Sequence, residues 1–267
     1  MPSLLTPPRR RGVEILDGPD VDPAVVRRSL ADVALANALF GGTRAVLAEV
    51  AWVLPQLGPR ATLLDVGTGA GDIPLRATRL AARRGVALAT VGVDASAALA
   101  AAYRGRLGDV VCGDVRALPF APASVDLVVC SQLLHHFPDA ELAPLLRELH
   151  RVARVRVIVS DLRRSWLAAA GLWAASFPLG FHPVSRHDGV VSVLRGFTAA
   201  ELRAAVRGAV GANADVRRRL GWRLTASWAP GGVPNAPRRA VARPAAEQAP
   251  VRPAVPAPAT HAPAAGP

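Results

Sequence analysis

The sequence lacks most of the features that mark secreted or membrane-spanning proteins. Only two cysteines occur among its 267 residues, too few for a disulfide scaffold, so we expect a reducing, cytoplasmic setting. No apolar stretch follows the arginines at positions 9–11, and we expect no secretory signal. The longest weakly polar run, residues 166–181, contains Pro178 and is shorter than the ~20 residues that cross a bilayer.

Lysine is absent, so all 32 basic side chains are arginine. The net charge of +12 is typical of proteins that bind nucleic acid or anionic membranes. Because isoleucine and asparagine are also rare, we attribute the arginine excess to a compositional bias. Aromatic residues make up only 4% of the chain, which disfavours base stacking, and no lysine is available to complete a phosphate-binding P-loop.

Residues 22–228 carry one continuous alternation of predicted helices and strands. Two helices come first, at 23–40 and 43–54, and further helices are predicted at 73–84, after Ser96, at 139–151 and at 198–210. Short apolar runs predict buried strands at 61–66, 87–93, 109–112, 125–130 and 155–160. This alternation predicts an α/β fold with a doubly wound, largely parallel sheet.

The two ends of the chain differ from this middle part. We predict a flexible N-terminus for residues 1–21. Residues 229–267 hold 10 of the 24 prolines and almost no large apolar side chain, so we predict a disordered tail. Just before the tail, two strands are predicted at 214–219 and 223–228, joined by a tight turn.

A glycine-rich turn, Asp65-Val66-Gly67-Thr68-Gly69-Ala70-Gly71, follows the first predicted strand. Open parallel sheets bind ligands at such turns, where a strand ends and a helix begins. Glycine permits positive φ and lets a ligand approach the bare backbone. The G-x-G-x-G spacing differs from the G-x-G-x-x-G of dinucleotide-binding folds, which disfavours an NAD enzyme.

Carboxylates follow the next two predicted strands. Asp94 ends the second strand, where a carboxylate can accept hydrogen bonds from both ribose hydroxyls of a nucleoside. Asp114 follows the third strand, where a carboxylate can accept from an exocyclic amine such as that of adenine. Each is also a common turn residue, but their joint order with the glycine turn predicts a single nucleoside-binding crevice.

The ordered set of Asp65, the three glycines, Asp94, Asp114 and the apolar segment 126–130 resembles the class I S-adenosylmethionine-dependent methyltransferases over residues 22–228. The resemblance implies a seven-stranded sheet whose last strand is antiparallel, and S-adenosylmethionine as the cofactor.

The same resemblance assigns a role to each cofactor-binding position. The loop of Asp65, Gly67, Gly69 and Gly71 would hold the methionine part of the cofactor. The ribose would be bound by Asp94 with Ala95, and the adenine by Asp114 with Val115. Just after the fourth strand, Cys130 and Ser131 would line the reacting sulfonium.

A hydroxyl or acidic carbon must lose a proton before it takes a methyl group, and histidine is the usual base near neutrality. His135 and His136 follow the fourth strand and are the candidate catalytic residues. At most one of them is expected to face the substrate, and the alternative is that the pair packs its own loop. His182 and His187 are weaker candidates. We predict no metal site, because no pair shows a tight ligand spacing such as H-x-x-x-H.

An insertion at residues 162–196 separates the fifth strand from the last predicted helix, and its first half, 166–181, is apolar. It follows Asp161, which can orient a substrate, pair with an arginine or cap the next helix. The apolar half fits three interpretations: a core helix, a lid over a hydrophobic acceptor, or a shallow contact with a membrane surface through Trp166 and Trp173.

We therefore predict an enzyme of secondary metabolism that methylates oxygen or carbon of a hydrophobic, aromatic small molecule, such as a polyketide, a quinone or a lipid-like natural product. The alternatives are an RNA or protein methyltransferase and a non-catalytic S-adenosylmethionine-binding module. No nucleic-acid partner is expected, because residues 130–133 lack the [N/D/S]-P-P-[Y/F] pattern of amino-methylating nucleic-acid enzymes. The oligomeric state is left open.

Overall fold

The computed structural model describes residues 5–10, 12–18, 21–69, 71–95 and 109–231. The chain divides into two units, residues 1–237 and 238–267, and every described residue belongs to the first. Two predictions fall outside this description: the helix after Ser96, and the disordered tail beyond residue 231.

Seven strands form one sheet in the order β3-β2-β1-β4-β5-β7-β6. Strands β1 to β5 pair in parallel, whereas β7 runs antiparallel to both β5 and β6. The predicted doubly wound sheet with an antiparallel last strand is therefore confirmed. The strands are β1 (Arg60–Val66), β2 (Ala87–Asp94), β3 (Asp109–Cys112), β4 (Val125–Ser131), β5 (Ala153–Leu162), β6 (Asp215–Arg219) and β7 (Arg223–Trp228).

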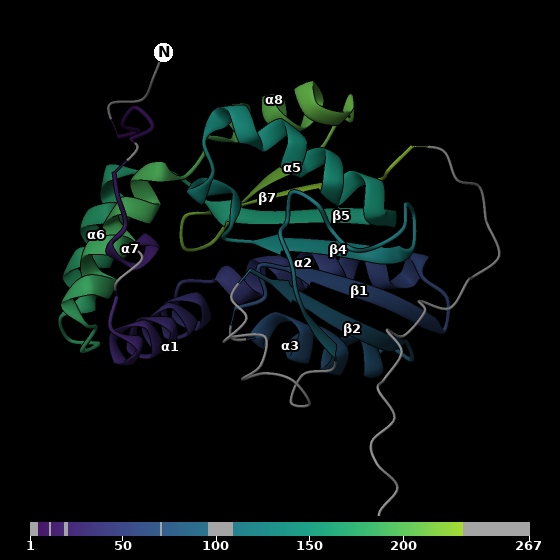
Figure 1. Cartoon of the computed structure of the whole chain (residues 1–267), viewed down its shortest axis with the longest axis horizontal. Helices are drawn as coiled ribbons and strands as arrows, with labels where there is room; N and C mark the ends of the chain where they lie inside the picture. The colour runs from purple at the N-terminus through teal and green to yellow at the C-terminus, as the bar shows by residue number, and fades with distance from the viewer. Residues whose placement is uncertain (1–4, 11, 19–20, 70, 96–108, 232–267) are drawn as a thin grey trace, which may run out of the picture. The chain divides into compact units, whose positions relative to one another are not determined.

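Helices cover both faces of the sheet (Figure 1). On one face, α2 (Gly42–Val53) and α3 (Asp72–Ala82) bury an apolar cluster that includes Val50, Ala77 and Leu127. On the other, α5 (Asp139–Val152) and α8 (Ala199–Val210) bury a larger cluster that includes Leu149 and Trp228. Covering on both sides explains why β4 is an uninterrupted buried run rather than an alternating one.

Three more helices lie beyond the carboxyl ends of the parallel strands (Figure 1). They are α1 (Pro23–Leu39), α6 (Trp166–Ser176) and α7 (Pro183–Arg195), and we call them the cap. The predicted insertion at 162–196 thus folds as two helices, α6 and α7, packed against each other. Because α6 begins shortly after β5 ends, the cap covers the edge of the sheet where the predicted site residues lie.

The N-terminus was predicted to be flexible, and its residues 5–10 and 12–18, which we call the N-terminal strap, make hydrogen bonds to the cap. The Trp166 N–H donates to the carbonyl of Leu5 at 3.0 Å, and the Arg10 N–H donates to that of Leu194 at 3.2 Å. Buried Asp188 of α7 accepts the backbone N–H groups of Ile15 and Leu16 at 2.8 and 3.0 Å. These partners lie far along the chain, so a local reading of composition missed them.

Among the described residues, no single helix is both long and apolar enough to cross a membrane. The stretch Pro23–Leu39 passes that test only together with Gly42–Gln56, at a bend of 57°. In α2, Val46, Val50 and Val53 are fully buried against the sheet.

Candidate active site

Backbone hydrogen bonds tie together the loops that leave β1, β2 and β3. The N–H groups of Gly67 and Thr68 donate to the carbonyl of Val93 at 2.8 and 3.1 Å. The Gly69 N–H donates to the Asp94 carboxylate at 3.0 Å, and the Gly113 N–H donates to the Asp94 carbonyl at 3.0 Å. The structure therefore brings the glycine turn, Asp94 and the start of the Asp114 loop to one edge of the sheet.

The turn after β1 requires its glycines. Gly67, Gly69 and Gly71 have φ values of 72°, 48° and 68°, which disfavour any side chain. A Cβ on Gly67 would lie 3.0 Å from the side chain of Leu133, whereas a Cβ on Gly69 would meet nothing within 4 Å. The backbone at Gly69 thus faces open space, which leaves room for a ligand to approach it.

Two buried polar atoms near this turn have no hydrogen-bond partner among the residues that the structure describes. Asp65 is 1% exposed; its Oδ2 accepts from the Thr68 hydroxyl at 2.9 Å, while its Oδ1 has no hydrogen bond. The Ser131 hydroxyl, at the end of β4, is also buried and unpaired. Buried polar atoms are normally satisfied, so both fit a site that is completed by a polar ligand such as the predicted cofactor.

Burial raises the pKa of Asp65 to about 7, although the hydrogen bond from Thr68 opposes this rise. The negative charges of Asp72 and Asp94 raise the pKa further. A cationic group placed beside Asp65 would favour its ionised form.

Asp114 is engaged in a way that the sequence did not indicate. Its two carboxylate oxygens accept from the Arg116 guanidinium at 2.7 to 3.1 Å, and Oδ1 also accepts the Arg116 N–H at 2.8 Å. These hydrogen bonds hold the pKa of Asp114 below its usual value. An adenine amine would have to compete with Arg116 for this carboxylate. Val115, its neighbour, packs in the apolar core.

Of the remaining predicted cofactor residues, Ala95 lies exposed, and its carbonyl accepts from the Cys112 thiol at 3.5 Å. Cys130 is buried in the apolar core, where burial and the nearby charges of Asp161 and Asp65 raise the pKa of its thiol. Cys130 therefore stays protonated and serves as a core residue, which leaves Ser131 as the polar group at this strand end.

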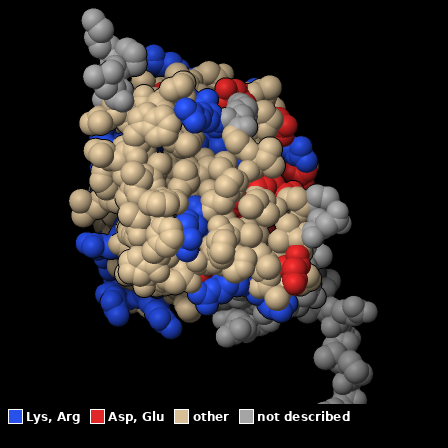
Figure 2. Space-filling view, turned by 90° about the vertical axis from the view of Figure 1, so that its left-hand side faces the viewer, with Lys and Arg blue, Asp and Glu red and all other residues tan. Residues whose placement is uncertain are grey.

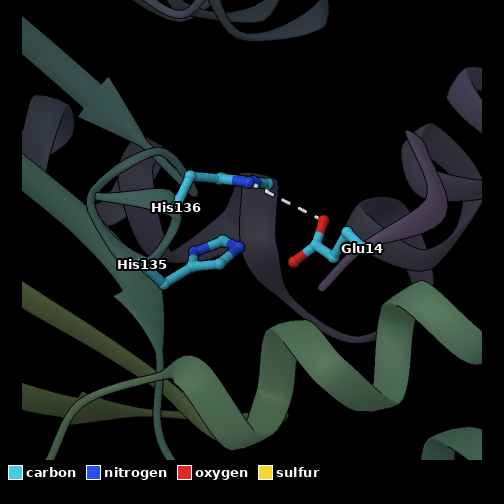
Figure 3. A group of neighbouring side chains, drawn as sticks. All are labelled: Glu14, His135 and His136. Carbon is cyan, nitrogen blue, oxygen red and sulfur yellow. Dashed lines mark ion pairs between the residues drawn. The ribbon is translucent and has the colours of Figure 1, made fainter. Parts of the chain in front are cut away.

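His135 and Asp161 form a buried pair at the ends of β4 and β5. His135 lies in a short helix, η3 (Leu134–His136), and its Nδ1 is 2.7 Å from Asp161 Oδ1. The other oxygen, Oδ2, accepts the His135 backbone N–H at 3.2 Å, and the Leu162 N–H donates to Oδ1 at 2.7 Å. With Nδ1 facing a carboxylate, the ring carries its proton there, and Nε2 is left as a proton acceptor. The ring itself points toward Glu14 of the strap (Figure 3).

Burial alone would raise the pKa of Asp161, but the charge and hydrogen bond of His135 outweigh it, and the pKa lies below its usual value. The backbone hydrogen bond from Leu162 acts in the same direction. Asp161 is therefore an anion at neutral pH, fixed by two backbone amides and one imidazole.

His136 binds the N-terminal strap rather than Asp161. Its Nδ1 lies 3.7 Å from Glu14 Oε2 and 3.5 Å from Asp17 Oδ1 (Figure 3). Burial lowers the pKa of His136, but the hydrogen bond to Asp17 and the charges of Glu14, Asp17 and Asp161 outweigh this, and the net shift is upward. Arg195 also pairs with both acids, at 2.9 and 3.1 Å. The charged form of His136 is therefore favoured by its acidic partners, and the side chain anchors the strap.

Glu14, His135 and His136 each offer one possible metal ligand, and these atoms lie within 4.8 Å of one another. The sequence spacing did not indicate this group, because Glu14 comes from a distant segment. Each member has a protein partner already: Glu14 Oε1 accepts from Ser192 and Arg195 at 2.8 and 2.9 Å, and His135 is held by Asp161. Ion pairs and hydrogen bonds within the protein therefore hold Glu14, His136 and Nδ1 of His135, while Nε2 of His135 is left as an acceptor.

The two weaker histidine candidates have other roles. The ring Nδ1 of His182 caps α7 by accepting the Val184 N–H at 3.3 Å. The backbone N–H of His182 donates to the Asp32 carboxylate at 2.8 Å. His187 lies on α7 with half of its side chain exposed, and its Nδ1 is 2.8 Å from Asp188.

Arg223 was missed at the sequence level. It is buried at the start of β7, and its guanidinium donates to Gln132 at 2.7 Å and to Asn37 at 3.4 Å. Burial lowers the pKa of Arg223 to about 10, while the charge of Asp161 opposes the shift. Arg223 thereby links the loop after β4 to the end of α1. No local sequence signal pointed to Arg223; the close approach of its turn to α1 shows only in the structure, where a Cβ on Gly221 would lie 1.8 Å from the Phe40 carbonyl oxygen.

Comparison with known proteins agrees with this geometry. Residues 63–156 match a family described as a methyltransferase domain (Methyltransf_25). The biotin biosynthesis bifunctional protein BioHC of Cellvibrio japonicus is 31% identical over 140 residues, which cover 49% of this chain and 27% of that protein. The chain thus spans about a quarter of the length of the curated relative it matches.

Two solved structures share the fold. A SAM-dependent methyltransferase from Aquifex aeolicus gives a TM-score of 0.50 at 17% identity, over 73% of this chain and 97% of that chain. The trans-methyltransferase CalH, in complex with SAH, gives 0.54 at 16% identity, over 77% of this chain and 61% of that chain.

Proposed function

We propose that this chain is an S-adenosylmethionine-dependent methyltransferase and that it methylates an oxygen or carbon atom of a hydrophobic, aromatic small molecule, which the match of residues 63–156 to a methyltransferase domain and the shared fold support. Relatives at this distance share the fold without fixing the acceptor, so the acceptor is argued from the site. The cytoplasmic setting and the role in secondary metabolism stay predictions from the sequence.

S-adenosylmethionine, when bound, supplies a methyl group on a positively charged sulfur, which is already electrophilic. The open backbone at Gly69 would hold its methionine part, and Asp65 would supply the negative charge next to it. Asp94, which already accepts from Gly69, would bind the ribose hydroxyls and so join the sugar to the glycine turn.

The buried pair of His135 and Asp161 is the observation that carries the proposal. Nε2 of His135 takes the proton from the acceptor hydroxyl or acidic carbon, while Nδ1 keeps its proton toward Asp161. Asp161 is already ionised, so it stabilises the imidazolium that forms. A positioned base of this kind contributes about 10²–10⁴-fold to the rate.

The cap supports a hydrophobic acceptor. Its helices α6 and α7 bury a cluster formed by Leu162, Ala168, Ala169 and Val193 together with Leu172, Val190 and Leu194. Residues 166–181 include no charged side chain, and α7 contacts the η3 helix that carries His135. This cluster is packed core rather than the lining of a cavity, so the hydrophobic acceptor is inferred from the apolar character of the cap next to His135, because apolar sites suit ligands whose surface is mostly apolar.

The test is methyl transfer from isotopically labelled S-adenosylmethionine to phenols, quinones and alkylpyrones, with RNA and bulk protein as competing acceptors. We expect label in one class of hydrophobic hydroxy-aromatic compounds. Label in RNA or protein alone would contradict the proposal, and a failure to bind the cofactor by calorimetry would contradict the whole assignment.

A further inference from the structure

The side of α6 that faces away from the rest of the domain is both apolar and exposed, and so is the turn that follows it. Trp166 is 38% exposed, Leu167 and Trp173 are each 53% exposed, and Phe177 is 48% exposed. The residues between them on the same side are small or apolar as well. We call this surface the α6 face: Trp166, Leu167, Ala170, Gly171, Trp173, Ala174, Phe177 and Pro178.

The α6 face differs from an ordinary surface helix, which places polar residues outward. Trp166, Trp173 and Phe177 are spaced by seven and four residues, which aligns them on one side of a helix. Contiguous exposed apolar patches on soluble domains commonly mark a binding surface. The question is therefore which partner would cover it.

Arginines lie at both ends of the α6 face. At its start, the Arg10 guanidinium lies 4.9 Å from the centre of the Trp166 ring. At its end, that of Arg186 lies 3.8 Å from the Phe177 ring. Nearby, the half-exposed Arg28 donates to the Gly180 carbonyl at 2.7 Å. Figure 2 views this side of the molecule and shows a broad uncharged area with basic side chains within it and along its lower margin, whereas the acidic side chains lie toward its right-hand side.

We propose that the α6 face docks the protein onto an anionic membrane surface. Tryptophan and phenylalanine insert at the level of lipid headgroups, and flanking arginines are attracted to anionic lipids. No acidic residue occurs in residues 166–181 to oppose that attraction. A second copy of this chain is a poorer partner, because a symmetric contact through this face would bring like-charged arginines together.

The proposal stands apart from the proposed function, because it does not depend on which molecule is methylated. Its test is co-sedimentation of the full chain with vesicles of phosphatidylcholine alone, or with one quarter phosphatidylglycerol, at low and high salt. We expect at least tenfold stronger binding to the anionic vesicles at low salt, and release at high salt.

The paired substitution Trp173→Ala and Phe177→Ala should weaken binding to anionic vesicles at least tenfold. Trp52→Ala is the matched control, because Trp52 is 44% exposed beside Arg156 and Arg217 but stands outside the α6 face. It should change binding less than twofold. If circular dichroism shows the paired variant to be misfolded, Leu167→Glu replaces it.

Three results would overturn the proposal. Equal binding to neutral and anionic vesicles would remove the role of the arginines. Unchanged binding in the paired variant would assign vesicle binding to arginines elsewhere in the chain. A concentration-dependent dimer in sedimentation velocity that the paired substitution abolishes, without vesicle binding, would make the α6 face a self-association surface.

Discussion

The two halves of the candidate active site are built in different ways. On the β1–β2 side, the contacts are local: Gly69 meets Asp94, 25 residues away, and Asp65 meets Thr68. On the β4–β5 side, the contacts join distant segments, as between Glu14 and Arg195, which are 181 residues apart. The cofactor half is thus a property of one short stretch of chain, whereas the half with the proposed base exists only after the whole domain has folded.

If the two halves are separable, removing the base should abolish turnover without affecting the cofactor. We expect His135→Gln and Asp161→Asn each to lower turnover by about 10²–10⁴-fold, the contribution of a positioned base. The Kd for S-adenosylmethionine should change less than twofold in both, as measured by calorimetry. Turnover is measured as the steady-state rate with the best acceptor.

His187→Gln is the control for these variants, because His187 also pairs with an aspartate but is half exposed on α7. It should retain full turnover. Normal rates in both His135→Gln and Asp161→Asn would show that the pair is structural and that the acceptor loses its proton in another way.

The reverse experiment acts on the cofactor half. Asp94→Ala removes a carboxylate that accepts from Gly69 and that would bind the ribose hydroxyls, so both the turn and the ligand lose a partner. Charge-assisted hydrogen bonds contribute about 1.5–3 kcal/mol, so affinity for S-adenosylmethionine should fall ~10-fold or more. Asp109→Ala, at the exposed start of β3, should bind normally. An unchanged Kd for Asp94→Ala would refute the ribose assignment.

The same contrast explains what the sequence could predict. Strand positions and the sheet type followed from apolar runs and their alternation with helices, because these patterns are local. The glycine turn and Asp94 followed for the same reason, since both end strands that pair in register, Val66 with Val93. The start of the helix predicted at 198–210 is local in the same way, since Thr198 and Glu201, which form the capping box of α8, lie within one turn.

The rest could not be predicted, because its partners are remote in sequence. The sequence left several possible roles open for Asp161. The fold decides between them, because it places Asp161 Oδ1 2.7 Å from Nδ1 of His135. The N-terminal strap looked loose because its composition is polar and proline-rich, and its stabilising contacts lie on α7. Asp114 is a different case: its binding of adenine stays a prediction, and the sequence did not indicate that Arg116, two residues later, donates to its carboxylate.

The pH dependence of the affinity for S-adenosylmethionine tests the role of Asp65 in the cofactor half of the site. Because the pKa of Asp65 is raised to about 7, the carboxylate is largely protonated at pH 6 and ionised at pH 8. Only the anion attracts a cationic ligand, so affinity for S-adenosylmethionine should rise several-fold between these values and level off above them. Asp65→Asn should bind more weakly and show a flat profile in calorimetry. A wild-type profile that is equally flat would place the cation away from Asp65.

The smallest effect belongs to the strap, on the other half of the site. The pKa of His136 is raised by Asp17 and Glu14, so its ion pairs stabilise the fold fully below the ordinary histidine pKa and fade as the pH rises through the raised value. The pKa of Asp17 is lowered, chiefly by the hydrogen bond from His136. The contribution of Asp17 to the stability of the fold is therefore lost only as the pH falls through that lowered value. The pairs should therefore contribute most at pH 5–6.

We accordingly expect His136→Gln to reduce the free energy of unfolding by ~0.2–1 kcal/mol at pH 5.5, the range of partly exposed ion pairs. The deficit should vanish at pH 9, where wild-type His136 is neutral as well. Urea unfolding at both pH values measures it. The deficits of Asp17→Asn and His136→Gln should add to more than that of the double variant, because both single variants lose the His136–Asp17 pair, whereas only Asp17→Asn also loses the pair with Arg195. A deficit of equal size at both pH values would mean that His136 acts through packing rather than charge, and the charged contacts of the strap would then be those with Arg195 and Asp188.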